Sequence, residues 1–442
     1  MIVVAPATAW GHSALATVRA TGDGVRDLLA EVVTPLRSGP WVANKTRRVS
    51  FSDATGVFDD GVAVWSPGPR TYTGEELLEV TCHGNPRIVE RLVQACVTAG
   101  ARMAQPGEFT HRAVAAGRMT LLDAEAVDLA CRATSDAGLQ IARTVFDGTL
   151  GASIAQMRED LVFVAAELEA RLDWPGDDLA TMDDTALLAR VAKVGERAAR
   201  LSASQSQARL LVDGARVAFV GPANAGKSSL FNAMVGSKRA LVHQLPGTTR
   251  DVVEASIGLG PLKITLYDTA GLRETDDPVE QAGLALAREI LEGADLLLLT
   301  VPVERWGTSE AMALPEALRE TPRLLVCNGV DRVPSSRRPT DVLCTSAVTG
   351  EGQEALEEAV VAALLGDGFV TDTLRIASRR QAELLSEVTD RCAEVPAALR
   401  EAGPAVAASV VLLAVAEVDG LTGADGQEDV LSSLFARFCI GK

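Results

Sequence analysis

The sequence predicts a multidomain fold of the α/β plus α type: an N-terminal α+β domain, then a helical domain split by an inserted, doubly wound α/β domain. The length of 442 residues suggests about three domains. Strand-like and helical runs alternate in two stretches of the chain, and helical periodicity flanks the second stretch on both sides. Hydrophobic residues make up 47% of the chain and charged residues 23%, a composition that excludes a disordered protein.

The N-terminal α+β domain is predicted at residues 1–117. Strand-like runs alternate there with one helical run that ends at Gly100. The predicted strands cover residues 2–5, 14–19, 61–65 and 77–83, and the predicted helix covers residues 89–99. Short strands with a helix of this length are typical of a compact α+β domain.

The helical domain is predicted in two parts, residues 118–213 and 369–442. In the first part, apolar residues recur at three- and four-residue steps, which places them on one helix face: Ile154, Met157, Leu161, Val164 and Leu168. The second part contains an apolar stretch of 12 residues, Ala405 to Ala416, which is too short for a membrane span and is predicted to be a buried core helix. A domain inserted between the parts is tolerated where their ends lie close together.

The net charge and the cysteines indicate which cellular compartment the protein occupies and how it could bind nucleic acid. The formal net charge is −17, so bulk charge does not hold nucleic acid, and a local basic patch or a basic partner would be needed. The seven cysteines show no C-x-x-C spacing, which argues against a zinc site, and the N-terminus shows no secretory signal. We therefore expect a protein of the reducing cytoplasm that does not enter a membrane.

The α/β domain, predicted at residues 214–368, carries a phosphate-binding motif. The strand-like run 216–220 leads into G-P-A-N-A-G-K-S at residues 221–228, and a helical run follows, which fits the P-loop pattern. Backbone N–H groups of such a loop close around phosphates at a helix N-terminus. Lys227 is predicted to reach the β- and γ-phosphates, and the Ser228 hydroxyl to bind Mg²⁺. The predicted contacts of this motif are Asn224, Ala225, Gly226, Lys227, Ser228 and Ser229.

Three further segments at the ends of predicted strands indicate a guanine nucleotide. Asp268 of the segment Asp268, Thr269, Ala270 and Gly271 is placed to reach the Mg²⁺ shell, and Gly271 to sense the γ-phosphate. In the segment Asn328 to Asp331, the Asp331 carboxylate would accept two guanine N–H groups that adenine lacks. A backbone N–H at Ser346 and Ala347 would bind the guanine oxygen.

In this order and spacing, the segments resemble those of the GTPase superfamily. The superfamily pattern N-K-x-D has a lysine whose stem covers the base, whereas this chain has Gly329 at that position. We expect the change to lower nucleotide affinity more than base selectivity, and a lysine restored at position 329 to tighten GTP binding.

Further motifs, most of them outside the α/β domain, narrow the resemblance to one family of GTPases. The chain ends in F-C-I-G-K, and its N-terminal part contains R-T-Y-T-G-E-E at residues 70–76, C-H-G at 82–84 and P-G-E-F-T at 106–110. The segment D-A-E-A-V lies at residues 123–127, and G-T-T-R-D at residues 247–251. Together these motifs resemble, over essentially the whole chain, the MnmE (TrmE) family of tRNA-modification GTPases.

The resemblance implies a K⁺ ion beside the phosphates, which would offset the charge that develops during hydrolysis. The implied K⁺ ligands are Asn224, His243, Leu245 and Thr248, and Thr249 would contact Mg²⁺. Because Leu272 replaces the glutamine that follows Gly271 in other GTPases, Glu280 is the implied residue that positions water. The residues alone leave two alternatives open: Asn224 as a turn-capping residue, and Glu280 as a solvated glutamate in the first turn of a helix.

The resemblance also implies a folate site in an N-terminal domain that forms a homodimer. The implied ligand is 5-formyltetrahydrofolate or methylene-tetrahydrofolate, and its implied contacts are Arg19, Glu79, Arg118 and Lys442, although each could be a surface charge. Two family motifs are altered: residues 8–13 read T-A-W-G-H-S, with a single glycine, in place of P-P-G-R-G-G, and Asn85 replaces a glycine after His83. We expect weakened folate binding, since glycine permits close backbone approach.

The implied function is a K⁺-stimulated GTPase that acts with an FAD-dependent partner of the MnmG (GidA) family in a heterotetramer. Together they would build an aminomethyl or carboxymethylaminomethyl group on C5 of the wobble uridine of tRNA. Cys439 is the candidate for covalent or acid–base work, with a buried structural thiol and a prenylation site as alternatives. Two other functions stay open: a ribosome-assembly GTPase switch, and a folate-binding protein with a degenerate GTPase domain.

Overall fold

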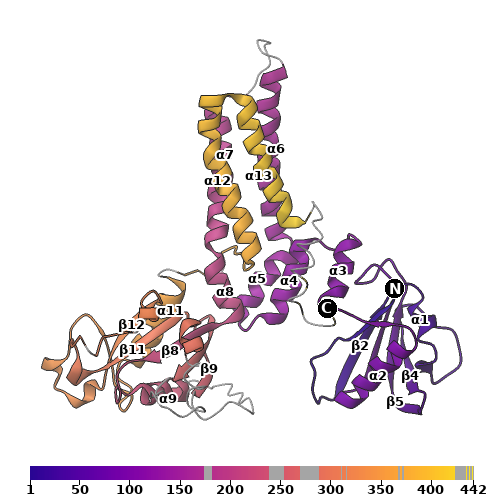
Figure 1. Ribbon diagram of the computed structural model, residues 1–442, viewed down its shortest axis with the longest axis horizontal. Helices are drawn as coiled ribbons and strands as arrows, with labels where there is room; N and C mark the ends of the chain where they lie inside the picture. The colour runs from indigo at the N-terminus through magenta and orange to yellow at the C-terminus, as the bar shows by residue number, and fades with distance from the viewer. Residues whose placement is uncertain are drawn as a thin grey trace. The chain divides into compact units, whose positions relative to one another are not determined.

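The computed structural model describes residues 1–173, 182–237, 253–268, 288–309, 311–314, 316–366, 369–370 and 373–423, and the single residues 435, 438 and 441 (Figure 1). The contacts divide the chain into two compact units. The first comprises residues 1–128, 154–162 and 412–442, and the second comprises residues 129–153 and 163–411. This division does not follow the predicted domain boundaries at 117/118, 213/214 and 368/369, which stay predictions.

The first unit contains a seven-stranded sheet in the order β3-β4-β5-β6-β2-β1-β7. Neighbouring strands are antiparallel, except that β1 and β7 are parallel. The strands are β1 (Val3–Pro6), β2 (Leu15–Thr21), β3 (Val33–Pro35), β4 (Thr46–Asp53), β5 (Gly56–Ser66), β6 (Leu77–His83) and β7 (Arg102–Met103). The four predicted strands are therefore present as β1, β2, β5 and β6, and the predicted helix is α2 (Pro86–Thr98).

The two faces of this sheet have different chemistry, because side chains alternate along each strand. Val18 and Ala20 of β2 are buried in the main core, against Val89 and Leu92 of α2. Arg19 of β2 points to the opposite face. On that face a smaller apolar cluster joins Val3, Ala5, Ala104 and Phe109, and helix α3 (Glu108–Ala115) supplies Phe109. The polar side chains on this second face form the N-terminal candidate site.

The helical part of the chain comprises α4 (Leu121–Arg132), α5 (Asp136–Phe146), α6 (Thr149–Asp173), α7 (Asp184–Ala203), α8 (Gln205–Asp213), α12 (Arg379–Ala402) and α13 (Pro404–Thr422). Helices α7 and α12 run side by side (Figure 1). A Cβ atom added at Gly195 of α7 would lie 3.0 Å from Cβ of Cys392 on α12. The small residue thus allows the close approach of two helices that the inserted domain separates in sequence.

Helix α13 contains the apolar stretch that was predicted to be a buried core helix. Among the described residues it is the one helix that is long and apolar enough to cross a membrane, by length and composition only, and 39% of it is buried. Ala407, Val411 and Val418 are buried, but Leu412 and Leu413 are 47% and 49% exposed. The prediction was therefore wrong for one face of the helix, because hydrophobicity alone does not show which positions meet the core.

The second unit contains a six-stranded sheet in the order β13-β12-β11-β8-β10-β9. Its strands are β8 (Ala215–Val220), β9 (Val253–Leu259), β10 (Leu262–Asp268), β11 (Leu296–Pro302), β12 (Arg323–Asn328) and β13 (Leu343–Thr345). All neighbours are parallel except β9 and β10. One face packs on α8, α9 (Lys227–Ser237) and α11 (Gln353–Leu365), and a separate apolar cluster covers the other face. Two covered faces confirm the predicted doubly wound fold.

Candidate functional site

The candidate site of the second unit lies where the parallel strands end. Register pairs Asp268 of β10 with Phe219 of β8, one residue before that strand ends. Asn328 of β12 pairs with Pro302 of β11 and with Thr345 of β13, so these strands end at the same level. Ligands of doubly wound folds bind at this edge of the sheet. The structure therefore brings the predicted segments at 221–228, 268, 328 and 346 to one edge.

The P-loop connects β8 to α9 and holds the lysine by its own backbone. Nζ of Lys227 donates hydrogen bonds to the carbonyl oxygens of Gly221 at 2.9 Å and Pro222 at 3.0 Å. The side chain is 8% exposed. Burial lowers the pKa of Lys227, and the negative charge of Asp268 opposes that shift. The loop is therefore a preformed anion site in which a phosphate oxygen would replace the two carbonyl oxygens as the partner of the ammonium group.

Asn328 braces the P-loop from the neighbouring strand. Its Nδ2 donates to the carbonyl oxygen of Ala225 at 2.9 Å, and its Oδ1 accepts from the Thr345 hydroxyl at 3.3 Å. A Cβ atom added at Gly226, where φ is +85°, would lie 2.3 Å from Nδ2 of Asn328. Both amide atoms of Asn328 are thus used within the protein, so its part in the predicted site is to position the loop.

Asp331 and Ser346, which are predicted to bind the guanine base, lie in contact with each other. Asp331 is exposed beyond the end of β12, and a hydrogen bond from the Ser346 side chain lowers the pKa of its carboxyl group. The Ser346 hydroxyl oxygen also accepts from the backbone N–H groups of Val348 at 3.3 Å and Thr349 at 3.2 Å. Ala347 follows directly in this turn. The exposed carboxylate and the turn beside it are the two features that guanine recognition requires.

The space above Gly329 is filled by an arginine that sequence reasoning missed. Gly329 has φ +79°, and a Cβ atom added there would lie 1.9 Å from Nη2 of Arg332. Nη1 of Arg332 also pairs with Oε1 of Glu304 at 3.3 Å. The guanidinium group therefore covers the backbone where the superfamily lysine would begin. The signal available in the sequence was an arginine directly after Asp331.

The predicted cation ligands of the P-loop face solvent. Asn224 is exposed and has φ +59°, a conformation that asparagine adopts more readily than most residues. Ser228 and Ser229 are exposed in the first turn of α9, whereas Asp268 is buried. The other predicted residues of this site lie outside the described part of the chain: His243, Leu245, Thr248, Thr249, Thr269, Ala270, Gly271 and Glu280.

The N-terminal candidate site, in the first unit, centres on a cross-strand ion pair. Arg19 of β2 lies directly opposite Glu79 of β6, and its Nε donates to Oε1 of Glu79 at 2.9 Å. The guanidinium carbon lies 5.4 Å from the centre of the Tyr72 ring and 5.7 Å from that of Phe109. Two of the four predicted folate residues are thus in contact, and aromatic rings border them.

The end of the chain returns to this site within the same molecule. Phe435 and Phe438 are buried with Leu121 and Ala124 of α4. The carbonyl oxygen of Gly441 accepts a hydrogen bond from Nη1 of Arg19 at 3.5 Å. Cys439 and Lys442 lie outside the described residues, but Gly441 between them stands beside the Arg19–Glu79 pair.

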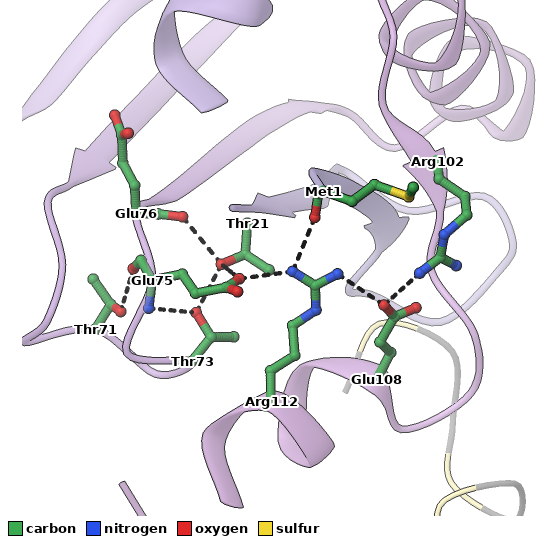
Figure 2. Close-up of polar contacts among 9 residues, drawn as sticks. All are labelled: Met1, Thr21, Thr71, Thr73, Glu75, Glu76, Arg102, Glu108 and Arg112. Atoms are coloured by element: carbon green, nitrogen blue, oxygen red, sulfur yellow. Dashed lines mark hydrogen bonds and ion pairs between the residues drawn. The ribbon is translucent and has the colours of Figure 1, made fainter. Parts of the chain in front are cut away.

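Arg118 and the motif at residues 70–76 hold the loop that borders the site. Nε of Arg118 donates to the carbonyl oxygen of Thr71 at 3.2 Å. Figure 2 shows Arg112 of α3 between two carboxylates, with Nη1 at 2.8 Å from Glu75 and Nη2 at 2.9 Å from Glu108. In the same network the hydroxyl groups of Thr21 and Thr73 are 2.7 Å apart (Figure 2). The hydrogen bonds of Thr73 and Glu75 with Thr21 and Arg112 therefore fix the loop at residues 70–76 against the sheet and helix α3.

Asn85, expected to weaken folate binding, occupies an ordinary helix-capping position. Its φ is −104°, and its side chain accepts from the N–H of Arg87 at 2.9 Å to cap α2. Asparagine is among the best N-cap residues, so the position does not need glycine for its conformation. The glycine that the local packing does require is Gly84, where an added Cβ would lie 2.2 Å from Oγ of Ser13.

Comparisons with known proteins match the chain along its length. The family model described as GTP-binding protein TrmE N-terminus matches residues 2–118, and the model described as MnmE helical domain matches residues 121–439. A protein of Akkermansia muciniphila named tRNA modification GTPase MnmE is 37% identical, covering 100% of this chain and 98% of that protein. Proteins of the same name from a Synechococcus strain and from Nitratidesulfovibrio vulgaris are each 35% identical, covering 99% and 100% of this chain and 97% and 99% of theirs.

Proposed function

The chain belongs to the family of tRNA modification GTPases named MnmE, and from that premise we propose which residues carry its activity and how. The protein is a GTP hydrolase that acts in tRNA modification, and it binds GTP and Mg²⁺. Membership over the full length favours this activity over a ribosome-assembly switch.

The observation that carries the nucleotide assignment is the braced P-loop. Lys227 would exchange its two carbonyl partners for phosphate oxygens of GTP, and Asn328 would hold the loop through Ala225 while it does so. Ser228 and Thr249 would complete the Mg²⁺ site with the phosphates, and Asp268 would lie in its outer shell. Asp331, with Ser346 and Ala347, would select guanine, because only a carboxylate accepts both of its N–H groups.

We assign K⁺ stimulation to Asn224, with His243, Leu245 and Thr248 as the other ligands and Glu280 as the residue that positions water. The support is that Asn224 is exposed on the P-loop and holds φ at +59°. Alanine at that φ would add backbone strain of about 1–2 kcal/mol, so Asn224→Ala changes the loop as well as the ligand. Asn224→Gly removes the amide oxygen without that strain.

The test is GTP turnover in K⁺ and in Na⁺ at equal ionic strength. We expect the native protein to turn over GTP faster in K⁺, and Asn224→Gly to show equal rates in both salts while it still binds GDP. Equal rates for the native protein would overturn the K⁺ assignment. Loss of GDP binding in the glycine variant would show instead that Asn224 has a structural part in the loop.

The tRNA chemistry is proposed to require the N-terminal site and the end of the chain. The protein would form a homodimer through its N-terminal domain and a heterotetramer with an FAD-dependent partner of the MnmG (GidA) family. A folate-derived carbon, from 5-formyltetrahydrofolate or methylene-tetrahydrofolate, would supply the aminomethyl or carboxymethylaminomethyl group at C5 of the wobble uridine. The contact between Arg19 and Gly441 supports this arrangement, because in the sequence Gly441 is one residue from Lys442 and two residues from Cys439.

A cysteine substitution separates the two activities. Cys439→Ser is expected to abolish tRNA modification in cells while GTP turnover of the purified protein is unchanged, because Phe438 and Gly441 belong to the first unit and the P-loop to the second. Cys131→Ser, at an exposed cysteine of α4, is the matched control and should retain both activities. Nucleoside mass spectrometry of total tRNA gives the first readout. Loss of both activities in Cys439→Ser would mean that the thiol is structural.

The cellular location is proposed to be the cytoplasm, where tRNA and the partner are found. Helix α13 buries Ala407, Val411 and Val418 inside the protein, as a core helix does, which is compatible with this proposal. Recovery of the native chain in the soluble fraction after lysis, without detergent, is the expected result, and recovery in the membrane fraction would contradict it.

A further inference from the structure

A pocket of about 610 Å³ lies in the second unit, away from the P-loop. Helices α7 and α8, the end of α11 and residues 369–370 and 373–375 line it, together with Ser153 of α6. Pockets that bind small molecules have volumes of about 300–1,000 Å³, so the space suits a molecule of the size of a metabolite.

Arginines dominate the charge of this pocket. Arg197 and Arg200 are three residues apart on α7 and therefore lie on the same side of that helix. Arg375 enters from the connecting segment, is 5% exposed, and its guanidinium carbon lies 4.5 Å from the centre of the Phe369 ring. Among the described residues that line the pocket there is no carboxylate. Two of these guanidinium groups also have partners within the protein: Nη1 of Arg200 lies 3.8 Å from Oε2 of Glu196, and Arg375 donates to the carbonyl oxygens of Thr373 and Val370. Three positive charges that line one pocket nevertheless favour an anionic ligand.

The pocket also contains a buried hydroxyl group that lacks a partner. Ser153 is 3% exposed, and its Oγ makes no hydrogen bond. An unsatisfied buried hydroxyl costs about 1–3 kcal/mol, so such groups are rare in folded proteins. A ligand atom in the pocket would supply the missing partner. This observation is independent of the arginines and also indicates a bound molecule.

The remaining wall is apolar. Leu201, Leu365, Phe369 and Leu374 line the pocket beside the arginines. Gln207 of α8 is already engaged, since its Nε2 donates to the carbonyl oxygen of Leu365 at 2.8 Å. A ligand that satisfied only the arginines would leave these apolar side chains facing water. The lining therefore matches a molecule with an anionic head and an apolar or aromatic body.

We propose that this pocket binds a small amphipathic organic anion. Its carboxylate or phosphate group would pair with Arg197 and Arg200, its apolar body would pack on Leu365, Phe369 and Leu374, and one polar atom would bond the Ser153 hydroxyl. The site is distinct from the P-loop and from the Arg19–Glu79 pair, and it does not depend on the proposed K⁺ or folate chemistry.

The test uses anilinonaphthalene sulfonate, a fluorescent aromatic anion, on the full-length protein with GDP in excess. Arg197→Ala combined with Arg200→Ala is expected to weaken probe binding about tenfold or more, through the loss of charge-assisted hydrogen bonds. Arg190→Ala is the matched control, because Arg190 is on the same helix but stacks on Phe163 at 4.4 Å, outside the pocket lining. GTP turnover of each variant checks that it is folded. Competition by naphthyl phosphate and by naphthoate shows which head group the site prefers.

Ser153→Ala supplies a second measurement. Removing the unsatisfied hydroxyl should raise the thermal unfolding midpoint of the ligand-free protein, while probe affinity falls. If the double arginine variant binds the probe as tightly as the native protein, the probe binds elsewhere on the chain and the proposal is overturned. If Ser153→Ala raises the midpoint and leaves probe affinity unchanged, the hydroxyl does not contact the ligand and the proposed pose is wrong.

Discussion

The P-loop and the Arg19–Glu79 pair each hold a positively charged side chain in place, but they do so in different ways. In the P-loop, backbone carbonyl oxygens hold the ammonium group of Lys227, and the Asn328 side chain holds the loop. In the N-terminal site, one charged side chain holds another, since Arg19 pairs with Glu79 across two strands. A phosphate would have to displace only neutral carbonyl oxygens from the ammonium group of Lys227. A folate carboxylate would have to compete with the charged carboxylate of Glu79 for Arg19.

This difference decides what a substitution does at each site. Where the backbone forms the site, an added side chain disturbs its shape, and binding and local structure are lost together. Where two side chains form the site, removal of either one leaves the sheet intact, because the strands are held by their own backbone ladder. We therefore expect the largest effects in the P-loop and smaller, separable effects around Arg19.

The largest expected effect comes from Gly226→Ala. The new Cβ would lie 2.3 Å from Nδ2 of Asn328 at a φ of +85°, so it would displace the brace and strain the loop. Strain of about 1–3 kcal/mol together with the lost hydrogen bond predicts a fall in GTP affinity of roughly a hundredfold. Titration with a fluorescent GTP analogue measures it.

Gly236→Ala is the matched control for that substitution. It lies in α9, where an added Cβ would meet nothing within 4 Å, and alanine in place of glycine inside a helix is expected to stabilise the protein by about 0.4–1 kcal/mol. Urea unfolding measures this gain. If both alanines had the same effect on GTP affinity, the backbone of the P-loop would not be the feature that matters.

Asp331→Asn has the next largest expected effect. The amide donates where the carboxylate accepted, so GTP affinity should fall by about ten- to a hundredfold while xanthosine triphosphate binds better. The hydrogen bond from Ser346 lowers the pKa of Asp331, so the native carboxylate stays charged well below neutral pH, and guanine preference should be lost only as the solution becomes strongly acidic. Unchanged preference in the variant would contradict the assignment of Asp331.

The sequence predicted where the described residues of the P-loop lie in the fold, because the motifs are local. A strand, a loop and a helix in that order already fix where Lys227 and Ser228 lie, and parallel strands bring Asp268 and Asn328 to the same edge. It did not reveal that Asn328 uses both amide atoms inside the protein, or that Arg332 covers Gly329. Both are contacts between side chains and backbone whose geometry no motif specifies.

The N-terminal sheet was less predictable for physical reasons. Strand β4 has only Val49 and Phe51 buried, among polar neighbours, and β3 has three residues, so neither gave a clear apolar pattern. The cross-strand register that sets Arg19 opposite Glu79 depends on long-range pairing of β2 with β6. The family resemblance named both residues, but their direct contact came only from that register.

Arg19→Ala and Glu79→Ala test the N-terminal site. We expect them to change the stability of the fold less than Gly226→Ala changes that of the P-loop. The side chains are 21% and 37% exposed, so the loss of their pairing should change the free energy of unfolding by less than about 1 kcal/mol. Calorimetry with 5-formyltetrahydrofolate should show binding to the native protein and none to either variant.

Arg87→Ala is the control for the folate measurement, because Arg87 pairs with Glu90 on an exposed face of α2. It should bind folate as the native chain does. No heat of binding to the native protein at saturating folate would mean that the site has another ligand. A large loss of stability in Arg19→Ala would mean that the pair supports the fold, as the residues of the P-loop do.

The smallest expected effect concerns Gly329, where the backbone and a side chain compete for one space. The sequence alone predicts that Gly329→Lys tightens GTP binding, but lysine at a φ of +79° adds about 1–2 kcal/mol of strain and its Cβ would meet the guanidinium of Arg332 at 1.9 Å. We therefore expect Gly329→Lys alone to change GTP affinity by less than about threefold. We expect Arg332→Ala alone to lower GTP affinity, also by less than about threefold. With both substitutions the lysine stem has room, so the pair should bind GTP more tightly than Arg332→Ala does. Equal effects of Gly329→Lys in the two backgrounds would show that Arg332 does not substitute for the lysine, since residues that share a space are not additive.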